Sequence, residues 1–151
     1  MKTYDDKLRT TLQAYGLRYS RPRGIILGYF GERAVHVSAE ELHHELKRRG
    51  ENFSLSTVYL NLSVLKHAGL VREISGAGGE AVYDSNVGPH HHLICTNCGA
   101  VSDLPEIVFQ DTVIADLLRL QAETLSGWQV DEPRLGLRGV CPACQESARR
   151  V

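Results

Sequence analysis

The stretch "PHHHLICTNCG", residues 89–99, concentrates three histidines and two cysteines, which are side chains that bind metals. The chain has four cysteines, and they form two C-x-x-C pairs, "CTNC" and "CPAC". Paired C-x-x-C units in a reducing compartment favour metal ligation over disulfides. A closed site of four thiolates is typical of structural zinc, because no coordination position stays open for a substrate. The predicted Zn(II) ligands are Cys95, Cys98, Cys141 and Cys144.

Other cysteine chemistries are less consistent with the pattern. A redox dithiol or a disulfide framework is the main alternative, but neither pair resembles a thioredoxin active site. "CPAC" shares a proline with the zinc deaminase motif, but that proline lies inside the pair rather than before it. Forty-two residues separate Cys98 from Cys141, so a shared zinc would link the start of the second half to its end.

The histidines require a separate explanation. On a strand, His90 and His92 share one face, whereas His91 points away. Three imidazoles with two carboxylates form a mixed set of ligands suited to Mn(II), Fe(II) or Zn(II). The alternative is that these histidines bind no metal and only form a polar strand edge beside the zinc knuckle, in a zinc-stabilised interaction module. The candidate set is His36, Asp84, His90, His92 and Asp103.

Composition describes a soluble globular protein of 151 residues, with 42% hydrophobic and 23% charged residues. The N-terminus carries two early aspartates and no apolar core, so we do not expect a signal peptide. No apolar run approaches the roughly 18 residues of a membrane span. The expected location is therefore cytoplasmic, with no membrane partner.

Charge is divided unevenly along the chain. Residues 1–83 hold twelve Lys and Arg against nine Asp and Glu, whereas residues 84–151 hold five against nine. The positive half is where we expect a polyanionic partner, although such a balance is also common on an ordinary solvated surface.

Periodicity divides the chain in the same place. Helical patterns cover residues 4–15, 21–30, 39–49 and 54–68, and Ser38 with Glu41 has the spacing of a capping box. Two β-like runs, 70–74 and 80–84, then form a hairpin. Helices, a helix-turn-helix pair and a hairpin are the order of a winged helix-turn-helix, here over residues 1–83.

Residues 84–151 predict a small α/β domain. Strands 91–95 and 100–104 flank the first C-x-x-C pair, a long helix covers 105–127, and strand-like segments near 128–131 and 134–140 lead to the second pair. The predicted fold class is thus α+β, with an N-terminal winged helix-turn-helix followed by an α/β domain that carries the zinc site.

Together, "HVSAEEL", "STVYLNLSVLKHAGLV", "HHHLICTNCG" and "GVCPAC" resemble the Fur family of metal-dependent transcriptional regulators. The resemblance covers nearly the whole chain. It implies a DNA-binding domain over 1–83, a dimerisation and metal-binding domain over 84–151, and a homodimer. That homodimer would bind double-stranded operator DNA when it is loaded with a regulatory metal.

Within the family, the chain is most similar to the peroxide-sensing, PerR-like branch, whose regulatory ligands are three histidines and two aspartates. This implies a repressor with Mn(II) or Fe(II) at the regulatory site, in which peroxide oxidises His36 or His90 of the iron form and releases DNA. Leu60 stands where iron sensors usually have an arginine. The matching ligand positions are His36, Asp84, His90, His92 and Asp103.

The start of the fourth helix is expected to reach DNA bases, and arginines near the second helix are candidate phosphate contacts. A manganese- or iron-uptake regulator with the same ligands and no peroxide sensing is the alternative function. A hydrolase or a non-haem iron oxygenase is disfavoured, because no general base stands near the ligands, so we predict that the chain is not an enzyme. The candidate DNA contacts are Arg18, Arg21, Arg23, Ser56, Thr57, Tyr59 and Asn61.

Overall fold

The computed structural model describes residues 3–150 and divides into two compact units, Met1–Val87 and Gly88–Val151. The first unit extends four residues beyond the boundary expected after residue 83. Asp84, which we expected to open the second domain, therefore lies in the first unit. The functions assigned to the two domains stay predictions. None of the described helices combines the length and apolar character needed to span a bilayer.

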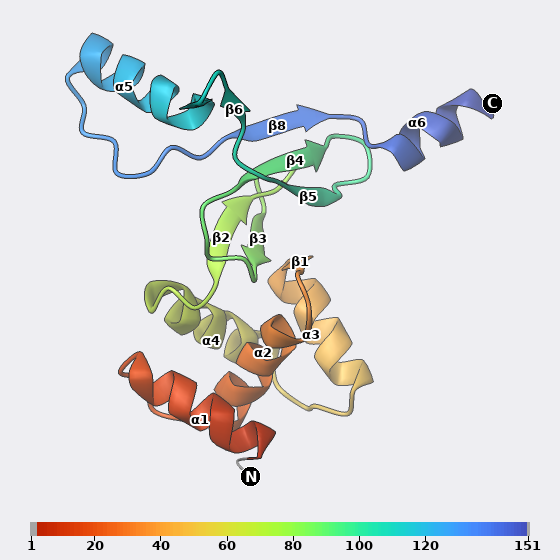
Figure 1. The fold of residues 1–151 in the computed structure, drawn as a ribbon. Coiled ribbons are helices and arrows are strands. Elements are labelled where there is room, and N and C mark those ends of the chain that lie inside the picture. The colour runs from red at the N-terminus through yellow and green to blue at the C-terminus, as the bar shows by residue number, and fades with distance from the viewer. Residues whose placement is uncertain (1–2, 151) are drawn as a thin grey trace. The chain divides into compact units, whose positions relative to one another are not determined.

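Four helices build the first unit (Figure 1), and the third begins with the capping box predicted at Ser38 and Glu41. The Ser38 hydroxyl accepts the backbone N–H of Glu41, and the Glu41 carboxylate accepts the N–H of Ser38 at 2.8 Å. This confirms the predicted capping box, which satisfies two N–H groups that the helix itself leaves without partners. The helices are α1 (Tyr4–Ala14), α2 (Arg21–Glu32), α3 (Ala39–Arg48) and α4 (Leu55–His67).

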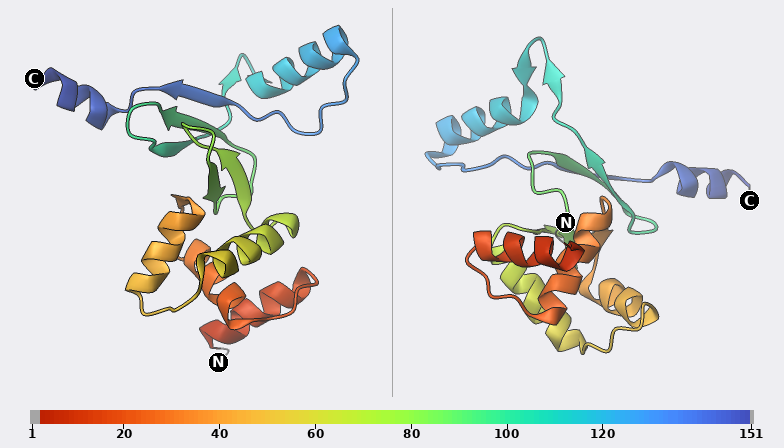
Figure 2. Two further views of the ribbon diagram at one scale, coloured as in Figure 1. Left: turned by 180° about the vertical axis from the view of Figure 1, so that it is seen from behind. Right: turned by 60° about the horizontal axis from the view of Figure 1, so that its bottom comes forward.

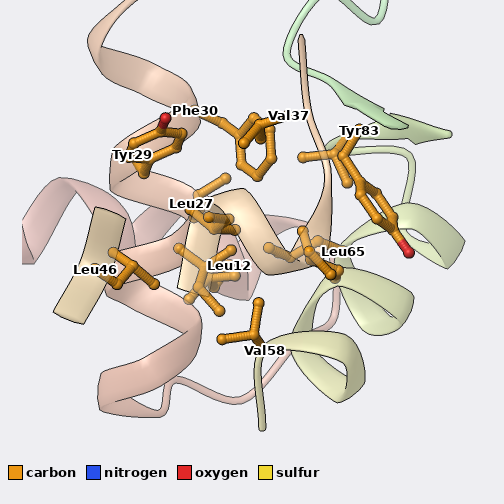
Figure 3. Packing of buried hydrophobic residues seen from close by; sticks show 14 residues of the cluster. Leu12, Leu27, Tyr29, Phe30, Val37, Leu46, Val58, Leu65 and Tyr83 are labelled. Atoms are coloured by element: carbon orange, nitrogen blue, oxygen red, sulfur yellow. The ribbon is translucent and has the colours of Figure 1, made fainter. Parts of the chain in front are cut away.

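The apolar stripes of these helices meet in one core, which Figure 3 shows from close by. The helix predicted over residues 4–15 ends one residue early, and Tyr15 is 52% exposed. Helix α1 ends at Ala14 and the chain turns at Gly16, which has a φ of 72°, so Tyr15 leaves the helical stripe. The fully buried side chains include Leu12, Ile26, Leu42, Val58, Leu62 and Leu65.

Two leucines of α4 allow a matched test of this core. Leu62 is completely buried, whereas Leu60 is 63% exposed. Leu62→Ala is expected to lower the free energy of unfolding by about 2–5 kcal/mol, because the substitution leaves a cavity. Leu60→Ala is expected to change it by less than about 0.5 kcal/mol. Urea titration followed by circular dichroism measures both, and equal effects would contradict this placement of α4.

A small antiparallel sheet completes the winged helix of the first unit. Its strands are β1 (His36–Val37), β2 (Arg72–Ser75) and β3 (Ala81–Asp84), in the order β1-β3-β2. The hairpin of β2 and β3 is the predicted wing. Because β1 pairs with the end of β3, His36 lies directly opposite Asp84.

The second unit contains a three-stranded sheet in the order β5-β4-β8. Strand β4 (His91–Cys95) is central. It pairs antiparallel with β5 (Val101–Leu104) and parallel with β8 (Gly136–Gly139). Helix α6 (Pro142–Arg149) follows β8, and Figures 1 and 2 show α5 (Ile114–Ser126) and α6 at opposite ends of this sheet. The mixed helix and strand content confirms the predicted α+β class.

The predicted helix over 105–127 is wrong in its first half. Strands β6 (Val108–Phe109) and β7 (Thr112–Val113) form a hairpin there, and α5 covers only Ile114–Ser126. The hairpin turn places the two residues at 110 and 111 at φ values of 48° and 60°, which a helix cannot contain. Residues 128–131 form no strand, and α6 was not predicted.

Candidate metal centres and DNA-facing helix

The four cysteine sulfurs of the second unit gather within 4.8 Å of one another. The sulfur of Cys95 lies 4.0 Å from that of Cys144, and the sulfur of Cys98 lies 3.7 Å from that of Cys141. Tetrahedral zinc with Zn–S bonds of about 2.3 Å holds its sulfurs about 3.8 Å apart, whereas a disulfide requires about 2.05 Å. The cluster therefore has the dimensions of a closed zinc site.

Backbone N–H groups prepare the cluster for a cation. The N–H groups of Cys141 and Cys98 point at the Cys95 sulfur, at 3.4 and 3.5 Å. These hydrogen bonds hold the pKa of the Cys95 thiol down to about 6. Because zinc binds thiolates and not thiols, the two backbone donors at the Cys95 sulfur fit the metal that we expected.

The second unit also brings together His90, His92 and Asp103. The Nε2 atoms of His90 and His92 lie 2.9 Å apart, and Asp103 Oδ1 lies 3.4 and 3.8 Å from them. The Nδ1 atom of His90 contacts the Gly88 carbonyl at 2.8 Å, a contact that requires a proton on Nδ1. In neutral His90 this leaves the Nε2 lone pair facing His92, as a metal ligand requires.

The first unit supplies the other two candidate ligands by the pairing of β1 with β3. His36 Nε2 lies 3.6 Å from Asp84 Oδ2. The other carboxylate oxygen of Asp84 accepts the N–H of Asn86 at 2.8 Å, which fixes the orientation of the carboxylate. Of the predicted ligands, two thus form a pair in the first unit, and three form a trio in the second: His36 with Asp84, and His90 with His92 and Asp103.

His91 differs from its two neighbours. Its Nδ1 accepts the N–H of Leu135 at 3.2 Å, so the proton of the neutral ring resides on Nε2. This Nε2 atom is buried without a hydrogen-bond partner. Within residues 3–150, no metal-ligating cluster includes His91.

Helix α4 presents part of the predicted DNA-contact set to solvent. Ser56 and Tyr59 are exposed, and Thr57 is half-buried. Asn61 is the least exposed of this set, at 4%, and its side-chain amide donates to the Thr57 carbonyl at 2.9 Å. One N–H of the amide is therefore occupied within the helix, and a contact of Asn61 with DNA stays a prediction.

The structure adds a partner that the sequence analysis missed. The Tyr59 hydroxyl donates a hydrogen bond to Glu40 of α3 at 2.6 Å. The hydrogen bond from Tyr59 lowers the pKa of the Glu40 carboxyl, which thus stays ionised. No spacing rule links residues 19 positions apart, so only the packing of α3 and α4 reveals this contact.

The three candidate phosphate-contact arginines lie in different surroundings. Arg18 is exposed. Arg21 pairs with Glu51 at 2.7 Å. Arg23 is half-buried and donates to the Arg18 carbonyl. Arg18 is therefore the best presented of the three toward a polyanion.

Comparison with known proteins gives a consistent result. The sequence profile of the Ferric uptake regulator family matches residues 14–135. The peroxide-responsive repressor PerR of Staphylococcus aureus (strain Mu50 / ATCC 700699) is 32% identical over 136 residues, which cover 90% of this chain and 88% of that protein. The Vibrio cholerae ferric uptake regulator is 30% identical, with a TM-score of 0.71 over 88% of this chain and 98% of that one. The ferric uptake regulator of Pseudomonas aeruginosa with manganese is 30% identical, with a TM-score of 0.63 over 89% and 97% of the two chains.

A winged helix in one unit and a zinc-type cysteine cluster in the other define a class of metal-binding, DNA-binding proteins. The profile match and the identity to PerR show that this chain belongs to the ferric uptake regulator family. The family and these relatives are transcriptional regulators, which confirms the predicted family and the expectation that the chain is not an enzyme.

Proposed function

We propose that this chain is a metal-dependent repressor that releases its operator in response to hydrogen peroxide. The observation that carries the metal dependence is the ligand chemistry, in which histidine rings oriented for metal binding lie beside the carboxylates of Asp84 and Asp103. The 32% identity to a peroxide-responsive repressor supports the response to peroxide. Structural Zn(II) at the four cysteines belongs to the same proposal.

The regulatory ion, Mn(II) or Fe(II), would be held by ligands from both units. We assign His36 and Asp84 of the first unit, together with the trio His90, His92 and Asp103 of the second, to one site. An ion that needs all five ligands favours one relative arrangement of the two units. If DNA binds that arrangement better, metal and DNA binding are coupled. When bound, iron also supplies electron-transfer chemistry toward peroxide, which manganese supplies poorly.

The functional DNA-binding form in this proposal is a homodimer. Two copies of α4 would enter successive major grooves of a pseudo-palindromic operator. Apolar surface in the second unit supports self-association, since Leu118, Leu120 and Leu125 of α5 are 47%, 57% and 83% exposed. Residues Ser56, Thr57 and Tyr59 would contact DNA from α4, and Arg18, Arg21 and Arg23 would contact phosphates. Such a repressor works in the cytoplasm, where its operator lies.

A regulator of metal uptake without peroxide sensing is the second candidate. The similarity to the Vibrio cholerae ferric uptake regulator, at 30% identity, favours it. The two candidates share their ligands and differ in whether a histidine is oxidised. Fe(II)-loaded and Mn(II)-loaded protein therefore provide a matched pair for the experiment.

The test is peptide mass spectrometry after a brief pulse of dilute hydrogen peroxide. We expect one added oxygen atom on the His36 or the His90 peptide of the iron form only, together with loss of operator binding. The exposed His44 and His67 serve as internal controls and should stay unmodified. Unmodified His36 and His90 peptides with intact operator binding would favour the uptake regulator.

A further inference from the structure

Helix α4 exposes an unusual set of side chains for a helix proposed to read DNA. Leu60 is 63% exposed and Tyr59 is 41% exposed, and Ser56 and Ser63 follow the same face of the helix. Val58 and the other buried residues of α4 lie on the opposite face. The face that would meet a major groove therefore offers hydroxyl groups and apolar carbon atoms.

The residues that usually read purines are missing from this face. Arginine and lysine recognise guanine, and asparagine and glutamine recognise adenine, by paired hydrogen bonds. The only asparagine of α4 is the buried Asn61. Its only lysine, Lys66, lies in the last turn and pairs with Glu73 at 2.8 Å. What remains for base recognition is hydroxyl groups, which bond to more than one kind of base edge, and apolar contact. In the major groove the base feature that favours apolar contact is the thymine methyl group, so the apolar side chain is the one that can select a base.

The neighbourhood of Leu60 is held in place. Tyr59 is tied to Glu40 on α3 by its 2.6 Å hydrogen bond, so the aromatic ring beside Leu60 cannot swing across it freely. Leu62, on the inward side, is completely buried and anchors this turn of the helix in the core. Leu60 therefore projects from a rigid position, which a specific methyl contact requires.

We propose that Leu60 is a specificity-determining residue that contacts the C5-methyl group of one thymine in each operator half-site. The inference rests on the proposed function, because it requires α4 to lie in the major groove. A lone exposed leucine is common on protein surfaces, so exposure alone does not show a role in DNA recognition. What distinguishes a thymine contact is a loss of DNA affinity when the C5-methyl group of that one thymine is removed.

The experiment first selects operator duplexes from a random library with Mn(II)-loaded protein. Each thymine is then replaced by deoxyuridine, which removes the methyl group and keeps base pairing, and Kd is measured by fluorescence anisotropy. We expect one position per half-site at which wild-type affinity falls about fourfold, the ratio that corresponds to about 0.8 kcal/mol for one buried methylene-sized group. Leu60→Ala should bind thymine and deoxyuridine equally at that position, whereas Leu60→Met should retain most of the discrimination.

The possible results test the thymine contact and the proposed function separately. Deoxyuridine effects that are the same in wild type and Leu60→Ala at every position would overturn the thymine contact, and so would an affinity loss in Leu60→Ala that keeps full thymine dependence. Both results would leave metal-dependent operator binding intact. Failure to select any duplex in a metal-dependent way would contradict the proposed function itself, and the thymine contact with it.

Discussion

Cys141→Ser is expected to abolish zinc binding and to unfold the second unit. The four sulfurs connect the end of β4 and the loop after it with the start of α6, and the buried apolar side chains among the described residues of this unit are only Ile94, Cys95 and Ala115. Structural zinc contributes about 10–16 kcal/mol in small zinc domains, which equals or exceeds the roughly 5–15 kcal/mol that stabilises a typical domain. The variant should contain no stoichiometric zinc by elemental analysis. It should also lose the part of the circular dichroism signal and of the thermal transition that belongs to the second unit, whereas the first unit, which has its own core, still melts cooperatively.

Ala143→Ser provides the matched control. It places the same hydroxyl between Cys141 and Cys144, at an exposed position of α6, and removes no thiolate. This control should keep one zinc per chain and the melting temperature of the wild type. If Cys141→Ser also kept its zinc and its melting temperature, the cysteine cluster would not be the structural site that we predict.

Asp84→Asn is expected to remove the metal dependence of operator binding without unfolding the first unit. The amide oxygen of asparagine can still accept the N–H of Asn86, so the turn after β3 is retained. The anionic ligand beside His36 is lost, however. Coupling between an effector and its ligand is typically 5- to 150-fold in affinity. We expect Mn(II) to raise operator affinity by a factor in this range in the wild type and by less than about twofold in Asp84→Asn.

Two further variants isolate the cause of that effect. Glu73→Gln removes one negative charge from the adjacent strand β2, where Glu73 pairs with Lys66 and not with the candidate ligands. It should keep the full response to Mn(II), measured by fluorescence anisotropy with and without the metal. His92→Ala removes a ligand of the other unit and should lose the response as Asp84→Asn does. Full metal dependence in both ligand variants would show that the regulatory site lies elsewhere.

The sequence alone predicted the features that depend on neighbouring residues in the chain or on the chemistry of one side-chain type. The helices of the first unit follow from apolar residues three and four positions apart, and the cap of α3 follows from Ser38 and Glu41. The two C-x-x-C pairs predicted the four cysteines that the fold brings together, because thiolates at that spacing have few other uses than metal binding. The family follows from motifs spread over nearly the whole chain.

Tertiary structure decided the features that depend on contacts between distant segments or on backbone conformation. The pattern of residues 105–127 is compatible with a helix, and only the left-handed turn at 110 and 111, inside the hairpin of β6 and β7, prevents one continuous helix there. Asn61 looked available for DNA, but its burial depends on how α4 packs in the core. Residue types and spacing therefore determined which side chains carry the chemistry. Packing decided which of them face solvent and in which orientation, because burial and hydrogen-bond partners arise from segments that the linear sequence does not bring together.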